Sequence, residues 1–309
     1  MNFKNLRWLI FSILAALCWG IWGVMAKIIS EDISPYMNHI LFTIGMLLTI
    51  PFVLKNAQQK PLNRKGIFWG VIAGFLAVAG NIAIYRAFAT GGLAAIVIPV
   101  SNLYPVVTIA IAIIVLKEKL HWLNGVGVLL AIFAIVILSG ETLLLNDPKS
   151  FFESMTLNTW LLSTLVALLF WGFFSAAQKI TTNHISAKRA YIIFVVSSVS
   201  ISLAFVVLGE ADWQISQRTT FLGSVAGMLN GLGVLASFAA YSAEGKASKV
   251  TTIAGALQPV FTILLAIFLL GENLSFLEVG GIAIAIVAAL MLSYERPPKV
   301  ISNILIKNA

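Results

Sequence analysis

Ten apolar runs, each about as long as a bilayer is thick, limit the possible folds of this chain more than any other feature. Their approximate positions are residues 8–29, 36–54, 67–89, 94–116, 122–140, 160–180, 190–208, 221–242, 250–270 and 276–294. A helix needs about 20 mainly apolar residues to cross a membrane, and it satisfies its own backbone hydrogen bonds in lipid. The runs therefore predict an all-α polytopic membrane protein with ten transmembrane helices.

The composition excludes an ordinary soluble protein. Apolar residues make up 60% of the chain and charged residues only 10%, against about 25% charged residues in soluble domains. The net charge of +8 would suggest nucleic-acid binding in a soluble protein, but the basic residues here lie in short loops between the runs. The single cysteine, Cys18, lies inside a run, and the three histidines show no metal-ligand spacing. We therefore expect no disulfide, metal, cofactor or nucleic-acid partner.

The basic residues are distributed unevenly between the two sides of the predicted bundle. With the N-terminus placed inside, only four of the 20 Lys and Arg residues lie outside, namely Lys27, Arg86, Lys149 and Arg218. Because cytoplasmic loops carry an excess of Lys and Arg, we expect a multi-pass protein of the cell (plasma or inner) membrane with both termini cytoplasmic. Lys4 and Arg7 before the first run also fit a cleaved signal peptide, but that run has a counterpart in mid-chain.

The two halves of the chain resemble each other. Residues 15–28 (AALCWGIWGVMAKI) align without gaps on residues 167–180 (ALLFWGFFSAAQKI). Residues 105–120 match residues 259–274 at nine of sixteen positions, and glycines of the third and eighth runs also align. The offset stays between 152 and 154 residues in all three regions. A constant offset indicates a duplicated unit of five runs.

The odd number of runs in the duplicated unit makes the second copy enter the membrane from the opposite side. We therefore predict two inverted five-helix repeats, residues 1–145 and 155–299, followed by a short cytoplasmic tail at residues 300–309. Inverted repeats are common in secondary transporters. Two similar halves of opposite orientation can exchange conformations and so expose one site alternately to each side.

The repeat and its motifs resemble the drug/metabolite transporter superfamily, in particular its EamA-type ten-span members. The resemblance covers nearly the whole chain. It rests on Trp-Gly in spans one and six, and on a proline and a closing glutamate in spans four and nine. The family's Gly-Glu pair is kept at Gly271-Glu272, whereas the first half has Lys117-Glu118. The resemblance implies a ten-helix fold around a central cavity, with export or exchange of amino acids, nucleotide sugars, drugs or other metabolites.

Polar and aromatic side chains inside the spans are the candidate solute-binding residues, because polar groups in lipid normally face the bundle interior or a watery cavity. The set comprises Trp19, Trp22, Asn81, Tyr85, Ser101, Asn102, Tyr104, Trp171, Gln178, Asn230, Ser237, Tyr241, Gln258 and Thr262. Thr251, Gly255, Gln258 and Thr262 share one face of the ninth span, and Ser101, Tyr104 and Thr108 occupy the equivalent positions in the fourth. The alternative for each residue is helix–helix hydrogen bonding or aromatic packing.

Two prolines and two glutamates are candidates for helix bending or gating. Pro105 and Pro259 free backbone carbonyls within the fourth and ninth spans, which predicts either a hinge or a static kink. Glu118 and Glu272 end the same two spans, one near each membrane face. Each carboxylate either caps the helix that follows it or takes part in a gate.

These features favour a secondary transporter that moves a small metabolite, an amino acid or a related solute, by alternating access, with export as the direction. The sequence contains no phosphate-binding loop that would indicate ATP as the energy source. A solute channel is one alternative, although neither a ring of like charges nor a repeated filter sequence is present. A membrane-embedded enzyme is the other, although the spans contain no catalytic cluster of polar groups. The expected partners are the solute and the lipid bilayer, and both a monomer and a homodimer stay open.

Overall fold

The computed structural model describes residues 7–54, 63–107, 110, 121–139, 159–243, 247–292 and 294, the side chains of residues 247–249 and 251–252 excepted. The described part of the first half forms α1 (Arg7–Ile29), α2 (Pro35–Leu47), α3 (Ile50–Leu54), α4 (Arg64–Ala89), α5 (Ala94–Ser101) and α7 (Trp122–Ser139). That of the second half forms α10 (Thr159–His184), α11 (Ala187–Val207), α12 (Gln217–Ser242), α13 (Ala247–Leu265), the π-helical turn η2 (Ala266–Leu270) and α14 (Phe276–Leu292).

The described residues contain helices and no strand, as the apolar runs predict. Seven helices are long and apolar enough to cross a membrane, and three shorter apolar helices at Ala94–Val107, Trp122–Leu138 and Phe276–Leu292 complete the ten spans. Polar side chains start several of them. Ser34 accepts a hydrogen bond from the amide of Met37 ahead of α2, and Ser216 accepts one from the amide of Thr219 at the start of α12. The fold class predicted from the sequence is therefore confirmed.

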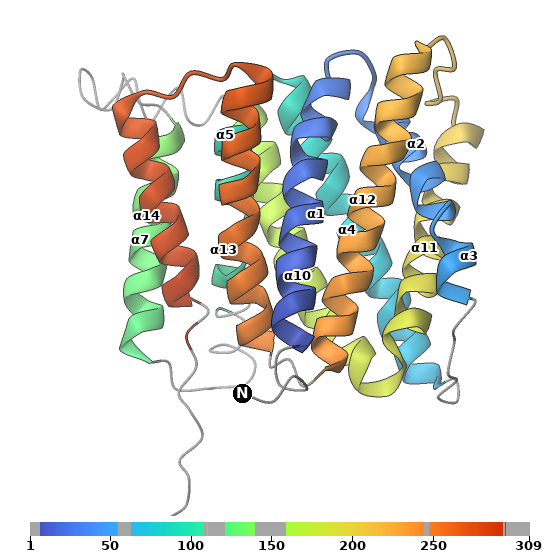
Figure 1. The fold of residues 1–309 in the computed structure, drawn as a ribbon, viewed down its shortest axis with the longest axis horizontal. Coiled ribbons are helices and arrows are strands. Elements are labelled where there is room, and N and C mark those ends of the chain that lie inside the picture. The colour runs from blue at the N-terminus through green and yellow to red at the C-terminus, as the bar shows by residue number, and fades with distance from the viewer. Residues whose placement is uncertain are drawn as a thin grey trace, which may run out of the picture.

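The two halves cross the molecule in opposite directions (Figure 1). Helix α1 begins at the edge drawn at the bottom, here called the lower edge, whereas α10 begins at the opposite, upper edge. The connection between α4 and α5 lies at the upper edge, and α14 ends at the lower edge. The described helices thus have the inverted order that an odd-numbered repeat requires.

Helices of the two halves pack into two mixed bundles. Bundle A contains α1 and α2 with α12 and α13, because α1 packs on both of the latter and α12 packs on α2. Bundle B contains α4 and α5 with α10 and α11, in the equivalent arrangement. Helices α7 and α14 pack on each other at one end of the molecule, as Figure 1 shows. Each bundle therefore combines helices from both sequence repeats, and the pseudo-two-fold axis exchanges the bundles.

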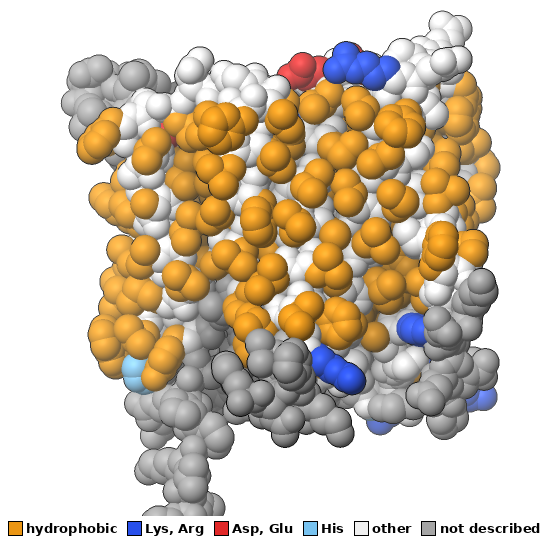
Figure 2. Space-filling view, viewed as in Figure 1, with side chains coloured by type: hydrophobic (Ala, Val, Ile, Leu, Met, Phe, Trp, Pro, Cys, Tyr) orange, Lys and Arg blue, Asp and Glu red, His pale blue; other side chains and the backbone are white. Residues whose placement is uncertain are grey.

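The outer surface is apolar around its middle and charged at its edges. Figure 2 shows hydrophobic side chains across the face of the bundle, and Phe52, Phe268 and Phe276 are among the most exposed. The six acidic residues that the structure describes all follow helix ends or begin helices at the upper edge: Glu31, Asp32, Glu210, Asp212, Glu272 and Glu278. An apolar belt between two polar edges is the surface expected of a protein embedded in a bilayer.

Three spans depart from continuous α-helix. The second is broken between α2 and α3, where the Thr49 hydroxyl donates to the carbonyl of Met46 and lies 2.7 Å from the Tyr191 hydroxyl. The fourth is interrupted after Ser101 by a turn that ends at Pro105. The ninth ends in the π-turn η2 and then Gly271, whose φ of +65° favours glycine. Of these breaks, the turn after Ser101 is buried, whereas η2 is largely exposed at the upper edge.

Candidate functional site

A narrow cavity lies between bundles A and B, and both bundles contribute to its wall. Its unfilled space amounts to ≈ 610 Å³, the open solvent at its mouth included. Its lining residues are Trp19, Trp22, Ala77, Asn81, Tyr104, Trp171, Phe174, Ser175, Gln178, Phe194, Asn230, Val234, Ser237, Tyr241, Val250, Ala254 and Gln258. The inverted repeat thus surrounds one shared space.

Aromatic rings from both bundles form much of this wall. The rings of Trp22 and Trp171 lie 6.0 Å apart between centroids at an angle of 53°. Glycines let two tryptophan rings pack closely on neighbouring helices. Trp171 packs against Gly80 of α4, and Trp19 packs against Gly233 of α12. Gly80 and Gly233 are equivalent positions of the repeat, as are Trp19 and Trp171. The pseudo-two-fold axis therefore places matching tryptophans on opposite sides of the cavity.

Three carboxamides on the wall have no protein partner. Asn81, Asn230 and Gln258 are each 4% exposed, and none makes a hydrogen bond to any other residue of the described chain. The polar atoms of these amides face the open space of the cavity, where water can reach them. The cavity therefore presents three donor–acceptor pairs to whatever fills it, water included.

A fourth carboxamide crosses the cavity from one bundle to the other. Gln178 of α10 is 2% exposed, although it lies near the end of the predicted sixth span. Its Nε2 donates to Ser237 Oγ of α12. This bond joins bundle B to bundle A at a point closer to the lower edge than Trp171, since α10 runs downward.

The lining that the structure describes includes no charged side chain. One cation contacts a lining residue, since Lys179 Nζ lies 5.9 Å from the centroid of the Tyr241 ring. Lys179 itself is outside the lining. The site therefore combines aromatic faces with neutral hydrogen-bonding groups.

Four of the predicted binding residues lie outside the cavity wall and have other contacts. Ser101 and Asn102 both donate to the carbonyl of Ile98 in their own helix. Thr262 donates to the carbonyl of Gly20 across the α1–α13 contact. Tyr85 is fully buried, with its ring 6.2 Å from that of Trp22 in an edge-to-face arrangement. For these residues the structure gives helix–helix or local hydrogen bonding and aromatic packing.

Seven lining residues were absent from the predicted set. They are Ala77, Phe174, Ser175, Phe194, Val234, Val250 and Ala254. The repeat alignment contained a signal for several of them, because Phe174 aligns with Trp22, Ala77 with Asn230 and Val234 with Asn81. Apolar counterparts of polar lining residues therefore line the same cavity.

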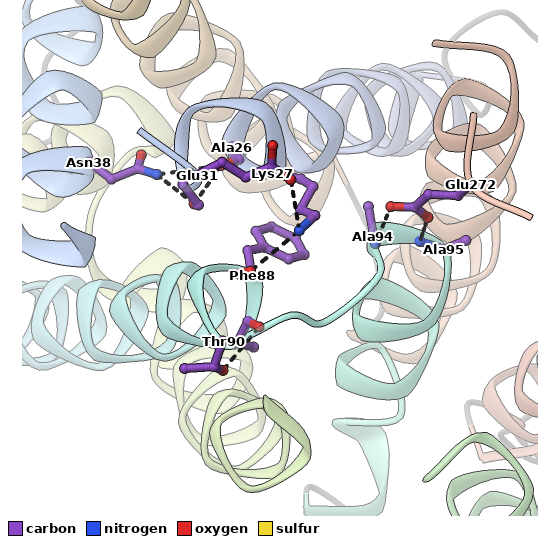
Figure 3. Close-up of polar contacts among 11 residues, drawn as sticks. Ala26, Lys27, Glu31, Asn38, Phe88, Thr90, Ala94, Ala95 and Glu272 are labelled. Carbon is purple, nitrogen blue, oxygen red and sulfur yellow. Dashed lines mark hydrogen bonds and ion pairs between the residues drawn. The ribbon is translucent and has the colours of Figure 1, made fainter. Parts of the chain in front are cut away.

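Charged side chains make contacts between helices at the upper edge (Figure 3). Lys27 Nζ of α1 lies 3.2 Å from Glu31 and 3.4 Å from the carbonyl oxygen of Phe88, near the C-terminus of α4. Glu272 accepts hydrogen bonds from the amides of Ala94 (2.8 Å) and Ala95 (2.9 Å), the first residues of α5. A cation at a helix C-terminus and a carboxylate at an N-terminus are both favourable. Both contacts join bundle A to bundle B.

Glu272 thus caps a helix of the other repeat, and α14, the helix that follows it, has its own cap. Ser275 and Glu278 form that cap, since each accepts a hydrogen bond from the backbone amide of the other. Pro105 is buried at the turn after α5, and Pro259 lies within α13 beside Gln258. The fourth predicted gating residue, Glu118, lies outside the described residues.

Comparison with known proteins identifies relatives along the whole chain. The EamA-like transporter family matches residues 6–140 and 158–294, one match in each repeat. A protein of Clostridium kluyveri named as an uncharacterized transporter is 23% identical over 298 residues, covering 91% of each chain. Another of that description, from Archaeoglobus fulgidus, is 21% identical over 288 residues, or 92% of this chain and 97% of that protein.

Two further similarities bear on the architecture. An uncharacterized protein of Methanocaldococcus jannaschii is 30% identical over 131 residues, which is 42% of this chain and 95% of that protein. That relative is therefore about as long as one repeat. A solved crystal structure with 16% identity superposes with a TM-score of 0.57 over 91% of this chain and 94% of that chain. At this identity the similarity supports the fold alone.

Proposed function

Because the chain belongs to the EamA-like transporter family and is a membrane transporter, we propose that it is a secondary transporter working by alternating access. In this proposal a small metabolite binds in the cavity between bundles A and B, and the bundles rock against each other to expose it to one side at a time. The sequence favours an amino acid or a related solute as cargo. The protein catalyses no chemical reaction in this account.

One observation carries the proposal: a single cavity is lined by both bundles, while the contacts above it join those same bundles. Lys27 and Glu272 hold bundle A to bundle B at the upper edge. The lining continues the other way, through Tyr241 at the end of α12 and Val250 in the first turn of α13. A site between two bodies that separable contacts hold together is what a carrier requires, whereas a channel needs a path that is open at both ends.

The distribution of charge supports an orientation. The described acidic residues gather at the upper edge, whereas Arg64, Lys65, Lys188 and Arg189 begin helices at the lower edge. An excess of basic residues marks the cytoplasmic side. We therefore place the lower edge and both termini in the cytoplasm of a cell-membrane protein. A cavity that continues toward that edge can be loaded from inside, which fits export.

Glu272 is the proposed gating residue of the outer closure. Its carboxylate must leave the amides of Ala94 and Ala95 before bundle A can separate from bundle B at that edge. Pro105 and Pro259 border the site and supply the bending points. By the symmetry of the repeat, Glu118 takes the corresponding part at the inner edge. The cavity is complete within one chain, so both a monomer and a homodimer are compatible with this mechanism.

Counterflow in proteoliposomes tests the proposal. Vesicles are loaded with one unlabelled solute at high concentration, and uptake of the same labelled solute is followed with and without a pH gradient. A carrier shows saturable exchange and transient accumulation of label. The double variant Tyr104→Ala/Gln258→Ala, which changes both walls of the cavity, is expected to lose at least about tenfold in exchange rate. Flux that never saturates, or exchange unchanged in the double variant, contradicts the proposal.

A further inference from the structure

We infer that the cargo is an uncharged, planar heteroaromatic solute with amide-like edges, of which a free nucleobase is the simplest example. The inference rests on the proposed function, because it assigns the chemical class that the transport site accepts. It narrows the amino acid or related solute that the sequence favours. Three properties of the cavity lining support this inference: its charge, its hydrogen-bonding groups and its aromatic rings.

The absence of charge in the described lining argues against ionic cargo. A carboxylate, phosphate or ammonium group that leaves water for a low-dielectric site needs an opposite charge or several strong hydrogen bonds. A zwitterionic amino acid needs both kinds of partner, and the lining offers neither. Lys179, over the Tyr241 ring, also disfavours an organic cation that would otherwise suit the aromatic faces.

The three partnerless carboxamides argue for amide-like edges on the cargo. Each of Asn81, Asn230 and Gln258 offers one C=O acceptor and one NH₂ donor side by side. Such a group makes paired hydrogen bonds with an edge that itself carries an adjacent donor and acceptor, as nucleobases and lactams do. An apolar solute would leave all three buried amides unsatisfied, which is the costly arrangement.

The repeat places two of these amides at the same end of the cavity. Asn81 aligns with Val234, and Ala77 aligns with Asn230, so each helix carries one amide and one apolar residue a turn apart. Helices α4 and α12 run in opposite directions. Asn81 therefore lies above Ala77, and Asn230 lies above Val234. One free amide from each bundle thus lies on the upper side of a small apolar residue of the same helix.

The aromatic wall argues for a flat cargo. Trp22 and Trp171 approach across the cavity, and Trp19, Phe174, Tyr104 and Tyr241 add further ring surface. Stacking on aromatic side chains is favourable for every nucleobase, because each has a π-face. A hydroxyl-rich sugar would present many more hydrogen-bonding groups than the three free amides can satisfy. The combination of ring faces and amide edges therefore selects planar heteroaromatic solutes among the uncharged ones.

The test is a panel of counterflow assays on the full-length protein. The probes are uracil and adenine, phenylalanine as a zwitterion, uridine monophosphate as an anion, tetraethylammonium as a cation, and glucose. The variants Asn81→Leu and Gln258→Met remove a free amide while keeping the approximate shape of the side chain. The matched control is Gln214→Met, which makes the same change at an exposed residue outside the cavity.

The expected result is saturable exchange of uracil or adenine by the wild-type protein and at least tenfold slower exchange of every other probe. Each cavity variant is expected to weaken nucleobase exchange by roughly tenfold, the effect of losing one or two hydrogen bonds. Each variant should leave the melting temperature of the empty protein at or above the wild-type value, because these amides make no hydrogen bond to another described residue. Gln214→Met should change neither quantity.

Three results overturn the inference, and a fourth counts against the carrier itself. Saturable exchange of phenylalanine, uridine monophosphate, tetraethylammonium or glucose in preference to the nucleobases would leave the carrier in place and refute the cargo class. A lower melting temperature in Asn81→Leu and Gln258→Met, with nucleobase exchange intact, would assign these amides to structure. Saturable exchange of none of the probes would contradict the cargo class, while unsaturable flux would count against the carrier itself.

Discussion

At the residue scale, the cavity depends on places where glycine lets an aromatic ring approach a helix. Trp19 Cδ1 lies 2.6 Å from the position that a Cβ atom on Gly233 would occupy, and the ring of Trp171 is comparably close to Gly80. Neither tryptophan could keep its place beside an alanine. Because Gly80 and Gly233 are equivalent in the repeat, the same kind of glycine–tryptophan contact positions a ring on each side of the site.

Gly233→Ala is therefore expected to displace Trp19 and to impair transport. The added methyl group overpacks the α1–α12 contact, which typically destabilises by about 1–3 kcal/mol. We expect a lower melting temperature in detergent and a reduced exchange rate in proteoliposomes. Gly125→Ala in α7 is the matched control, because a Cβ atom there meets no atom within 4 Å. The control should be neutral or slightly stabilising, and equal behaviour of the two variants would contradict the role given to Gly233.

Helix spacing predicted which faces are polar, but it could not say what each polar group contacts. Gln258 and Thr262 share one face of α13, yet Gln258 lines the cavity while Thr262 bonds the backbone of α1 at Gly20. The same limit applies to Asn102, which bonds the carbonyl of Ile98 in its own helix. The outcome depends on which neighbouring helix lies opposite each turn. That arrangement is tertiary and has no signature in the spacing of one span.

At the scale of elements, the sequence predicted the ends of the spans closely, but it did not predict the interruptions of the helix inside them. The first span was expected at residues 8–29 and is α1, Arg7–Ile29. At the break before α3, which Pro51 favours locally, Thr49 also contacts Tyr191, a residue far away in the sequence. The cap on α5 likewise depends on Glu272, from the other repeat. Local pattern determines where a helix can form, and long-range contacts help to determine where it is interrupted.

The cap on α5 yields a prediction about backbone protection. Glu272→Ala removes the acceptor for the amides of Ala94 and Ala95, and an N-terminal cap contributes about 1 kcal/mol. Hydrogen–deuterium exchange of the segment that contains these amides should be roughly fivefold faster in the variant. Glu278→Ala is the matched control, since Glu278 caps α14 within its own repeat by accepting from the amide of Ser275.

The control should deprotect the start of α14 and leave α5 unchanged. If Glu272→Ala leaves the exchange of α5 unchanged, the carboxylate does not hold the two bundles together at the upper edge. If both variants deprotect α5 equally, the effect is a general loosening of that edge and Glu272 has no particular role in its closure.

At the scale of the whole molecule, the sequence repeats and the packed bundles are different divisions of the chain. Each sequence repeat consists of five consecutive spans, whereas each bundle combines helices from both repeats. Bundles A and B border the cavity, and the contacts of Lys27 and Glu272 link them at one edge. If the bundles move as units, opening at one edge must accompany closing at the other.

The most direct test of this reciprocity uses a cysteine in the cavity. Val234→Cys is introduced together with Cys18→Ala, which removes the single native cysteine, and the rate of modification by a membrane-impermeant thiol reagent is measured from each side of the membrane. Alternating access predicts that adding Glu272→Ala raises the rate from outside and lowers it from the cytoplasmic side. Rates that rise together on both sides, or an outside rate that Glu272→Ala leaves unchanged, would contradict a carrier that opens one side at a time.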